Sequence, residues 1–331
     1  MTALSTHAVV FEQPGSLQLR QLSLVTPAAS DLVVETEYTG ISTGTERLLW
    51  EGRMPAFPGL GYPLVPGYET VGRVVQSGES CTAREGDRVF VPGAACYADN
   101  VRGLFGATAS RLVVAEDRCL SVATMPAEQG VLLALAATAM HMLTHRVARE
   151  SGHVATLSDA RDHAPQLIVG HGTLGRLLAR LCVALGAPEP VVWETDPVRR
   201  KGASDYSVIA MEDDDRRDYA RACDVSGASG EMFNDVIARM RPAGEFVLGG
   251  FYSEPVSFDF PPAFMREVTL SIAAQWQPND FVLVQSLIAV NALSLDGLVS
   301  HMSSVSKAKS AYHQAFNDKE CLKMALDWRD S

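Results

Sequence analysis

The hydrophobic pattern of the chain changes its period near residue 127. Before that point, short runs of apolar and β-branched residues are separated by Gly, Pro, Ser and Asp, which is typical of strands joined by turns. The expected strands are residues 7–11, 31–39, 70–76, 87–91 and 110–114. Many short strands with such turns predict a small barrel or sandwich.

A helical period begins after residue 127 and then alternates with short apolar runs. We expect helices at 128–150 and 231–240, the second ended by Arg241 and Pro242, and further helices in the tail, clearest at 281–292 and 306–316. The expected strands are 166–169, 190–193, 206–210, 223–225, 245–248 and 270–274. This alternation predicts an α/β, doubly wound parallel sheet over residues 127–278, with 279–331 packing back on a β-rich domain of residues 1–126.

The best-defined local motif is a glycine turn between an apolar run and an amphipathic helix. Gly170, Gly172 and Gly175 read G-x-G-x-x-G, and leucines follow at helical spacing. In this geometry the first glycine permits a tight turn, the second lets the backbone approach a pyrophosphate, and the third allows close helix–strand packing. The first helical residues, Thr173 and Leu174, would offer N–H groups to phosphates. We therefore predict a dinucleotide site; a purely structural turn is the alternative.

An acidic residue at the end of the next strand bears on which dinucleotide binds. Glu194 would accept hydrogen bonds from an adenosine ribose and would repel a 2′-phosphate, which favours NAD over NADP. Arg199 and Arg200 follow closely and could instead bind that phosphate, although a solvated turn is their simpler interpretation.

Composition and charge restrict the partners. The net charge of −11 argues against nucleic acid and against adhesion to anionic lipid. No segment approaches 18 uninterrupted apolar residues and no basic-then-apolar signal begins the chain, so we expect a cytoplasmic protein. The six cysteines are scattered without C-x-x-C, so neither a disulfide framework nor a four-cysteine zinc lobe is expected.

A long loop at residues 40–69 interrupts the β-rich part and is unusually apolar. Long loops on barrels are usually functional or disordered, and the hydrophobicity of this one argues against disorder. Trp50, Phe57, Tyr62 and Leu64 could line a pocket for a large apolar ligand. The alternative is that these side chains simply cover the mouth of the barrel.

The order of these motifs resembles the medium-chain dehydrogenase/reductase superfamily. G-Y-E-T-V-G-R-V-V at 67–75, E-G-D-R-V at 85–89 and G-H-G-T-L-G at 170–175 carry the resemblance. It implies a GroES-like barrel domain joined to a Rossmann domain, and a homodimer. By analogy, Thr138, Ser226, Gly227, Gly249 and Gly250 would contact the cofactor.

A narrower resemblance extends from end to end of the chain. Residues 40–69 together with G-L-F-G-A-T-A-S-R-L-V, V-V-W-E-T-D-P, F-P-P-A-F-M-R-E and C-L-K-M-A-L-D-W-R are similar to the dehydrogenases of bacteriochlorophyll synthesis that act on the 3-(1-hydroxyethyl) group of bacteriochlorophyllide a. This resemblance implies NAD-dependent oxidation to the 3-acetyl group, a chlorin or bacteriochlorin substrate, and transient contact with the photosynthetic membrane or with neighbouring pathway enzymes.

The chain departs from the zinc-dependent members of the superfamily at the metal. Ser42 and Tyr68 stand where those enzymes carry cysteine and histidine, and a serine hydroxyl and a phenol are poor zinc ligands, so we expect no metal. His141 and His145, four residues apart, lack a third ligand.

Side chains must then do the work of the metal on the alcohol oxygen. The candidates come from the two loops that match the zinc-binding segments, with His141 as an outside candidate: Ser42, Thr43, Thr45, Glu46, Tyr68 and Glu69. The structural alternatives are a salt bridge of Glu46 or Glu69 with Arg47 or Arg53, and a core-lining Tyr68. Two other functions stay open, a zinc-independent NADPH quinone or enone reductase and a non-catalytic protein that binds dinucleotide and pigment.

Overall fold

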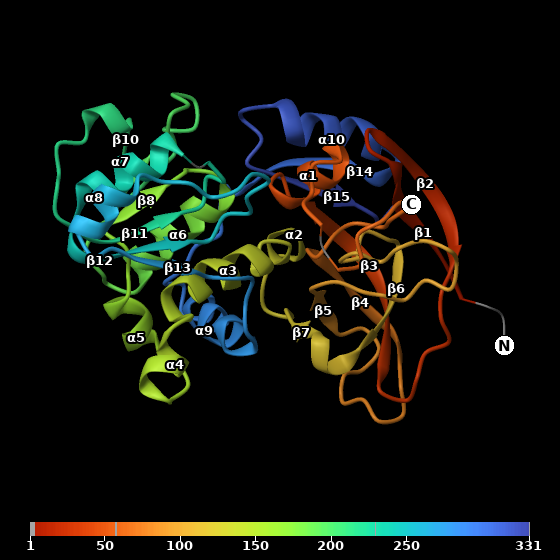
Figure 1. Cartoon of the computed structure of the whole chain (residues 1–331). Helices are drawn as coiled ribbons and strands as arrows, with labels where there is room; N and C mark the ends of the chain where they lie inside the picture. The colour runs from red at the N-terminus through yellow and green to blue at the C-terminus, as the bar shows by residue number, and fades with distance from the viewer. Residues whose placement is uncertain (1–3, 57, 229, 331) are drawn as a thin grey trace. The chain divides into compact units, whose positions relative to one another are not determined.

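The computed structural model describes residues 4–56, 58–228 and 230–330, and it contains two large sheets of different construction (Figure 1). One is mainly antiparallel and is built from both ends of the chain. The other is entirely parallel and uses the middle of the chain. The predicted fold class, a β-rich domain joined to a doubly wound parallel sheet, is confirmed.

The mainly antiparallel sheet has the strand order β14-β15-β3-β4-β5-β7, and β6 also pairs with β3. A separate hairpin joins β1 and β2. The bounds of these strands are β1 Ser5–Gln13, β2 Ser16–Ser23, β3 Asp31–Ile41, β4 Thr70–Ser77, β5 Arg88–Val91, β6 Arg111–Ala115, β7 Leu120–Ser121, β14 Val299–Ser304 and β15 Lys323–Asp327. Because β15 pairs with β3, side chains near the two ends of the chain meet inside one domain.

The parallel sheet has the order β10-β9-β8-β11-β12-β13. β9 and β10 follow β8 on one side and β11 to β13 on the other, so the strand order reverses between β8 and β11. Its strands are β8 Leu167–Val169, β9 Val191–Trp193, β10 Ser207–Ile209, β11 Tyr219–Asp224, β12 Met240–Leu248 and β13 Thr269–Ile272. In a doubly wound sheet, ligands bind beyond the carboxyl ends of the strands at such a reversal.

Ten α-helices occur in the described part of the chain. They are α1 Thr45–Glu51, α2 Ala127–Gly130, α3 Leu133–Thr144, α4 Val147–Ser151, α5 Leu157–Asp162, α6 Thr173–Ala184, α7 Glu231–Arg239, α8 Phe260–Met265, α9 Pro278–Ala289 and α10 Ala308–Asn317. Three short 3-10 turns lie at Glu116–Arg118, Met211–Asp213 and Val305–Lys307.

The single helix expected at 128–150 is wrong, because the structure divides this segment into α2, α3 and α4. Gly130 packs so closely on β4 that a Cβ there would lie 2.6 Å from the Val71 side chain. At the second break, the carbonyl of Met142 accepts hydrogen bonds from Arg221 (3.0 Å) and the His145 ring (3.2 Å). An i→i−4 bond from Arg146 would need that carbonyl, so side chains have replaced the helical bond.

Two regions contain strand residues that the pattern did not predict. The tail forms α9 and α10 close to the two expected helices, yet it also contributes β14 and β15; β15 is buried along most of its length and therefore lacks the polar–apolar alternation of a half-exposed strand. Arg241 and Pro242 do follow a helix, but they lie within β12, whose pairing with β11 shifts register there.

The chain forms two compact units. One contains the residues up to Ala134 and those from Asp296 onward, and the other runs from Leu135 to Leu295. The sequence-based boundaries placed residues 127–134 in the Rossmann domain and 279–295 outside it. α9 belongs with the second unit because its Asp280 hydrogen-bonds to His141 (2.8 Å) and Thr144 (2.7 Å) of α3.

Candidate active site

A pair of hydroxyl groups lies where β3 ends and β4 begins. β3 and β4 are antiparallel, with Thr39 opposite Thr70, so Ser42 and Tyr68 come together just beyond the ladder. Their hydroxyl oxygens are 2.6 Å apart, and the Tyr68 hydroxyl also donates to Thr45 Oγ1 at 3.5 Å. Burial, reinforced by the negative charge of Glu69, raises the pKa of Tyr68 far above its usual value. Tyr68 is therefore a neutral phenol that can donate a hydrogen bond.

Glu69 is held by a cation that the sequence analysis missed. Lys323 Nζ lies 2.8 Å from Glu69 Oε1 and 2.7 Å from Oε2, and it also donates to the Ile41 carbonyl at 3.2 Å. Both side chains are almost completely buried. Burial raises the pKa of Glu69, and the ammonium of Lys323 opposes that rise. Gly40 makes room for the pair, because a Cβ there would lie 2.2 Å from Glu69 Oε2.

Glu46 is a second fully buried carboxyl group in the same unit. Its Oε1 accepts the N–H of Ser42 at 3.1 Å and its Oε2 accepts the hydroxyl of Tyr312 at 2.7 Å. Both described donors are neutral. Burial raises the pKa of Glu46 to about 7, against the opposing effect of the Tyr312 hydrogen bond. The ammonium of Lys323 therefore binds Glu69, whereas the described hydrogen bonds of Glu46 come from uncharged groups.

The expected arginine partners of these glutamates are elsewhere. Arg47 and Arg53 both pair with Glu51 on the surface, so the predicted salt bridges of Glu46 or Glu69 with them are wrong in their partners. Thr43 is only partly buried, at the turn before α1.

The aromatic side chains of the long loop pack on the first unit. Trp50 contacts Phe11 edge-on, with ring centroids 5.5 Å apart, and the hydroxyl of Tyr62 donates to the Leu49 carbonyl. Leu64 is fully buried and its backbone pairs with Phe11, so it belongs to the core rather than to an open pocket wall. Trp50 and Tyr62 are partly exposed and stay candidates for a pocket; Phe57 lies outside the described residues.

The glycine turn has the shape of a phosphate cradle. Gly170 has φ +103°, and a Cβ on Gly175 would lie 1.9 Å from the Gly170 carbonyl oxygen. Around Gly172, by contrast, the space that a Cβ would occupy is open, and no side chain caps the start of α6. The N-terminus of α6, which begins at Thr173, therefore has room for an anionic group beside Gly172, so these residues fit a dinucleotide pyrophosphate.

Glu194 is tied to this turn. Its Oε2 accepts the N–H of His171 at 3.0 Å, and its Oε1 accepts the N–H of Asp196 at 2.9 Å. Arg200 donates its guanidinium to the carbonyls of Glu194 and Thr195 at 2.9 and 3.1 Å, so it is occupied with the backbone. The carboxylate therefore stays next to the turn without a neutralising contact from Arg200.

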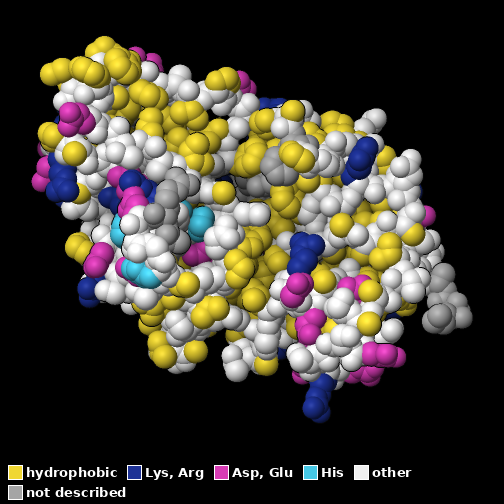
Figure 2. Space-filling view, turned by 60° about the horizontal axis from the view of Figure 1, so that its bottom comes forward, with side chains coloured by type: hydrophobic (Ala, Val, Ile, Leu, Met, Phe, Trp, Pro, Cys, Tyr) yellow, Lys and Arg dark blue, Asp and Glu magenta, His cyan; other side chains and the backbone are white. Residues whose placement is uncertain are grey.

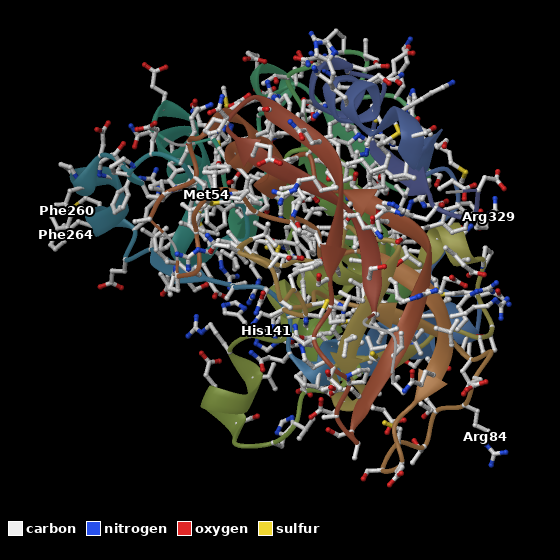
Figure 3. All side chains as sticks on the ribbon, turned by 90° about the vertical axis from the view of Figure 1, so that its right-hand side faces the viewer. Met54, Arg84, His141, Phe260, Phe264 and Arg329 are labelled. Carbon is white, nitrogen blue, oxygen red and sulfur yellow. The ribbon has the colours of Figure 1, made fainter. Side chains whose placement is uncertain are left out.

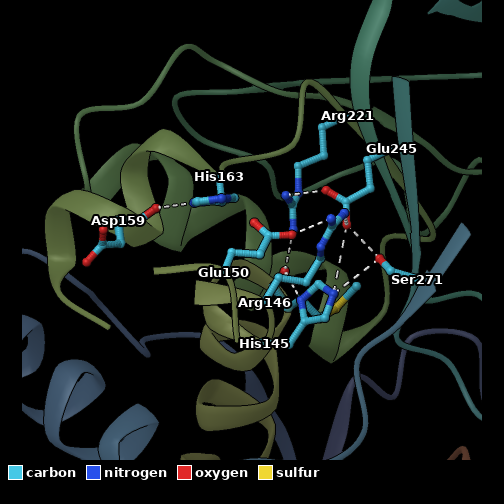
Figure 4. A network of polar contacts seen from close by, with 9 residues as sticks. His145, Arg146, Glu150, Asp159, His163, Arg221, Glu245 and Ser271 are labelled. Atoms are coloured by element: carbon cyan, nitrogen blue, oxygen red, sulfur yellow. Dashed lines mark hydrogen bonds and ion pairs between the residues drawn. The ribbon is translucent and has the colours of Figure 1, made fainter. Parts of the chain in front are cut away.

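His141 and His145 have separate partners. His141 Nδ1 is 2.8 Å from the buried Asp280. His145 belongs to the polar network of Figure 4, where its Nε2 is 3.2 Å from Ser271 Oγ, which in turn donates to Glu245 at 2.7 Å. Burial lowers the pKa of His145 to about 4. This network joins α3 to β12 and β13 and explains His145 structurally. Within the described ranges, no three His, Cys, Asp or Glu side chains form a group that could hold a metal ion.

The remaining cofactor candidates lie on the second unit. Ser226 and Gly227 follow β11, and Gly249 and Gly250 follow β12. Thr138 lies on α3 and is mostly buried. The absence of a side chain at Gly249 is needed, because a Cβ there would lie 2.4 Å from Met142 Sδ.

The chain is similar to known proteins over its whole length. Residues 28–124 match the model of the alcohol dehydrogenase GroES-like domain. A 2-desacetyl-2-hydroxyethyl bacteriochlorophyllide A dehydrogenase from Rhodobacter capsulatus is 49% identical, covering 99% of this chain and 100% of the relative. Its counterpart from Cereibacter sphaeroides is also 49% identical, covering 98% and 99%.

Solved structures agree on the fold. The 2R,3R-butanediol dehydrogenase of Bacillus subtilis superposes with a TM-score of 0.77 at 19% identity, covering 98% of this chain and 99% of that one. An alcohol dehydrogenase of Escherichia coli complexed with NADH superposes with a TM-score of 0.79, also at 19% identity, with the same coverage. Among the described residues, no helix combines the length and the apolar character needed to span a bilayer.

Proposed function

The chain belongs to the family of the 2-desacetyl-2-hydroxyethyl bacteriochlorophyllide A dehydrogenases, and from this we propose that it oxidises the 3-(1-hydroxyethyl) group of bacteriochlorophyllide a, or of chlorophyllide a, to the 3-acetyl group with NAD+. The substrate rests on the full-length identity with two relatives. The observation that carries the chemistry is the Ser42–Tyr68 hydroxyl pair in the same unit as the buried carboxyl groups of Glu46 and Glu69.

Tyr68 and Ser42 bind the alcohol oxygen in this proposal. Oxidation develops negative charge on that oxygen, and fixed hydrogen-bond donors in a dry site stabilise such charge. The raised pKa of Tyr68 keeps its proton available for donation. Ser42 and Tyr68 do not fit zinc, since neither offers the thiolate or imidazole that the metal prefers, so the hydroxyl pair takes over its role of charge stabilisation.

Glu46 is our choice for the group that takes up the hydroxyl proton, because its carboxyl group accepts the backbone N–H of Ser42 at 3.1 Å, next to the hydroxyl pair. A general base works best when its pKa is close to the working pH, and burial brings Glu46 to about 7. Glu69 is less suited, because its lone pairs accept two short bonds from Lys323. We assign Glu69 and Lys323 to holding the loop that carries Tyr68.

The glycine turn and Glu194 define the cofactor proposal. The N–H groups of Thr173 and Leu174 would bind the pyrophosphate, and Glu194 would bind the adenosine ribose. Bound NAD+ supplies the hydride acceptor. The Glu194 carboxylate would repel a 2′-phosphate, and the guanidinium of Arg200 donates to two backbone carbonyls, so those N–H groups are already engaged. These features support NAD over NADP.

An apolar edge of the second unit supports a homodimer. β13 ends the parallel sheet, and its outer side is unpaired among the described residues. Ile272 is 77% exposed, and Phe260, Phe264 and Met265 of the adjacent α8 are each more than 60% exposed. Hydrophobic side chains gather at the upper left of Figure 2, and Figure 3 shows Phe260 and Phe264 projecting outward. A flat apolar edge strand is normally covered, here by the same strand of a second copy.

A visible absorption time course tests the reaction. Purified protein is mixed with a 3-(1-hydroxyethyl) bacteriochlorophyllide and NAD+, with NADP+ and cofactor-free controls. We expect the pigment band to shift in step with NADH formation, and only with NAD+. No shift with a folded protein that binds NAD+ would reject the substrate. Turnover of quinones with NADPH would favour the reductase, and binding without turnover would favour a carrier.

A further inference from the structure

Asp224 is a fully buried carboxyl group at the end of β11 that the proposed mechanism does not use. Its Oδ1 accepts hydrogen bonds from the N–H and the hydroxyl of Ser226, at 3.2 and 2.6 Å, and its Oδ2 accepts one from the hydroxyl of Tyr252. Its carbonyl oxygen accepts the N–H groups of Gly249 and Gly250 at 2.9 and 3.2 Å. One residue thus bonds to the segments that follow both β11 and β12.

These segments lie in close backbone contact beside the glycine turn. A Cβ on Gly170 would lie 3.1 Å from the Cα of Ser226, and one on Gly250 would lie 3.1 Å from the nitrogen of Gly227. β8, β11 and β12 are adjacent parallel strands, so their carboxyl ends share one edge of the sheet. Glu194 directly follows β9, which is on the opposite side of β8 from β11. β11 and β12 therefore belong to the half of the sheet that receives the second mononucleotide.

We propose that Asp224 is a positioning residue for the cofactor, whose carboxyl group holds Ser226 and Tyr252, and with them the segments that follow β11 and β12, at the spacing that the nicotinamide half of the dinucleotide requires. The proposal rests on the proposed function, because it takes the dinucleotide site as given. Burying a carboxyl group costs free energy even when it is hydrogen-bonded, and burial raises the pKa of Asp224 against the effect of Ser226 and Tyr252. That cost is understandable if the carboxyl group arranges a binding surface.

The test compares Asp224→Asn with a matched variant of another buried carboxyl group, which hydrogen-bonds to strands of the same sheet. The amide keeps the size of the side chain but loses one acceptor oxygen. We expect the KM for NAD+ and the Kd for NADH, followed by its fluorescence, to rise about tenfold, with kcat changed much less. Tyr252→Phe removes one hydrogen bond and should raise both constants by about threefold.

Asp214 provides the control. It is 5% exposed and accepts hydrogen bonds from Trp193 Nε1 at 2.7 Å and from Tyr219, at the opposite end of β11, at 2.8 Å. Asp214→Asn should lower the Tm and leave the KM for NAD+ unchanged. If Asp224→Asn behaves in the same way, or if Tyr252→Phe binds NADH like the wild type when Asp224→Asn fails to fold, the proposal is overturned. A wild-type protein that binds no NADH would instead overturn the dinucleotide site itself.

Discussion

Lys323 and Glu69 form a buried ion pair across 254 residues of sequence, with the ammonium 2.7 and 2.8 Å from the two carboxylate oxygens. β15 brings the lysine beside β3, and β4 begins directly after the glutamate. The pair therefore ties the strand near the end of the chain to the loop that carries the hydroxyl pair.

Removing the cation should be costly. Lys323→Met leaves the Glu69 carboxylate buried without its partner, and we expect the free energy of unfolding to fall by about 3–5 kcal/mol in urea titrations. Arg47→Met is the control, since its pair with Glu51 is on the surface and should contribute about 0–1 kcal/mol. Equal losses in the two variants would show that the buried pair contributes no more to the free energy of unfolding than the surface pair does.

Tyr68→Phe should mainly affect turnover. The variant loses the donor to the alcohol oxygen, and we expect kcat to fall by about 10²–10⁴-fold while the KM for NAD+ stays the same. Tyr97→Phe serves as the control: its hydroxyl, in the same unit, donates to the Gly106 carbonyl at 2.6 Å, so its loss should reduce stability and not kcat. A Tyr68→Phe enzyme with full turnover would remove Tyr68 from the mechanism.

The pH dependence of oxidation should follow Glu46. The carboxyl group must lose its own proton before it can accept another, so kcat/KM should rise with pH through about 7. Glu46→Gln should be slow and lack this inflection. Glu51→Gln, on the same helix but paired at the surface, should retain it. An unchanged profile in Glu46→Gln would assign the base elsewhere, with His141 the next residue to test.

The same raised pKa determines the sign of a stability change. Between the ordinary carboxyl pKa of 4.5 and about 7, the folded protein keeps a proton on Glu46 that the unfolded chain releases. The free energy of unfolding should therefore fall as pH rises through this range. Glu46→Gln should lack this part of the fall, which urea titrations at several pH values would measure.

Glu194→Gln should weaken the discrimination between cofactors. The amide oxygen can still accept the N–H of His171, while the charge that repels a 2′-phosphate is gone. We expect the ratio of kcat/KM for NAD+ over NADP+ to fall about tenfold, which corresponds to about 1.4 kcal/mol. Glu189→Gln removes a surface charge before the same strand and should leave the ratio unchanged. An unchanged ratio in Glu194→Gln would contradict the assignment.

A charge on the apolar edge should separate the proposed dimer. Ile272→Lys places an ammonium on β13, and we expect sedimentation to give the monomer mass of 35.6 kDa in place of twice that value. Val154→Lys places the same charge at an exposed apolar residue outside β13 and α8, and it should leave the mass of the dimer unchanged. A wild-type protein that sediments as a monomer would refute the dimer directly.

Local patterns predicted the region around the glycine motif well. The motif at 170–175 joins β8 to α6 and includes the first turn of that helix, because a strand, glycines and a helix that follow one another directly are specified by neighbouring residues. The prediction of one helix at 128–150 failed for the opposite reason. The breaks in this segment depend on Val71 and Arg221, which are distant in sequence and cannot be read from a helical period.

The groups around the hydroxyl pair were only partly predictable. The loops carrying Ser42, Glu46 and Tyr68 match zinc-binding segments of the superfamily, so they could be singled out. Lys323 and Tyr312 could not, because their contacts exist only after β15 and α10 have packed against the N-terminal part of the same unit. The one available signal was a lysine inside the apolar run C-L-K-M-A-L, since a buried lysine requires a partner.

The discontinuity of the first unit has a consequence for biosynthesis. A ribosome delivers β3 and β4 long before β15, so the growing barrel lacks its neighbouring strand, and Glu69 lacks its ammonium, throughout the synthesis of the Rossmann unit. The middle unit, continuous from Leu135 to Leu295, is the first that can close on itself during translation. Truncated chains that end between residues 296 and 322 should therefore bind dinucleotide but fail to turn over an alcohol.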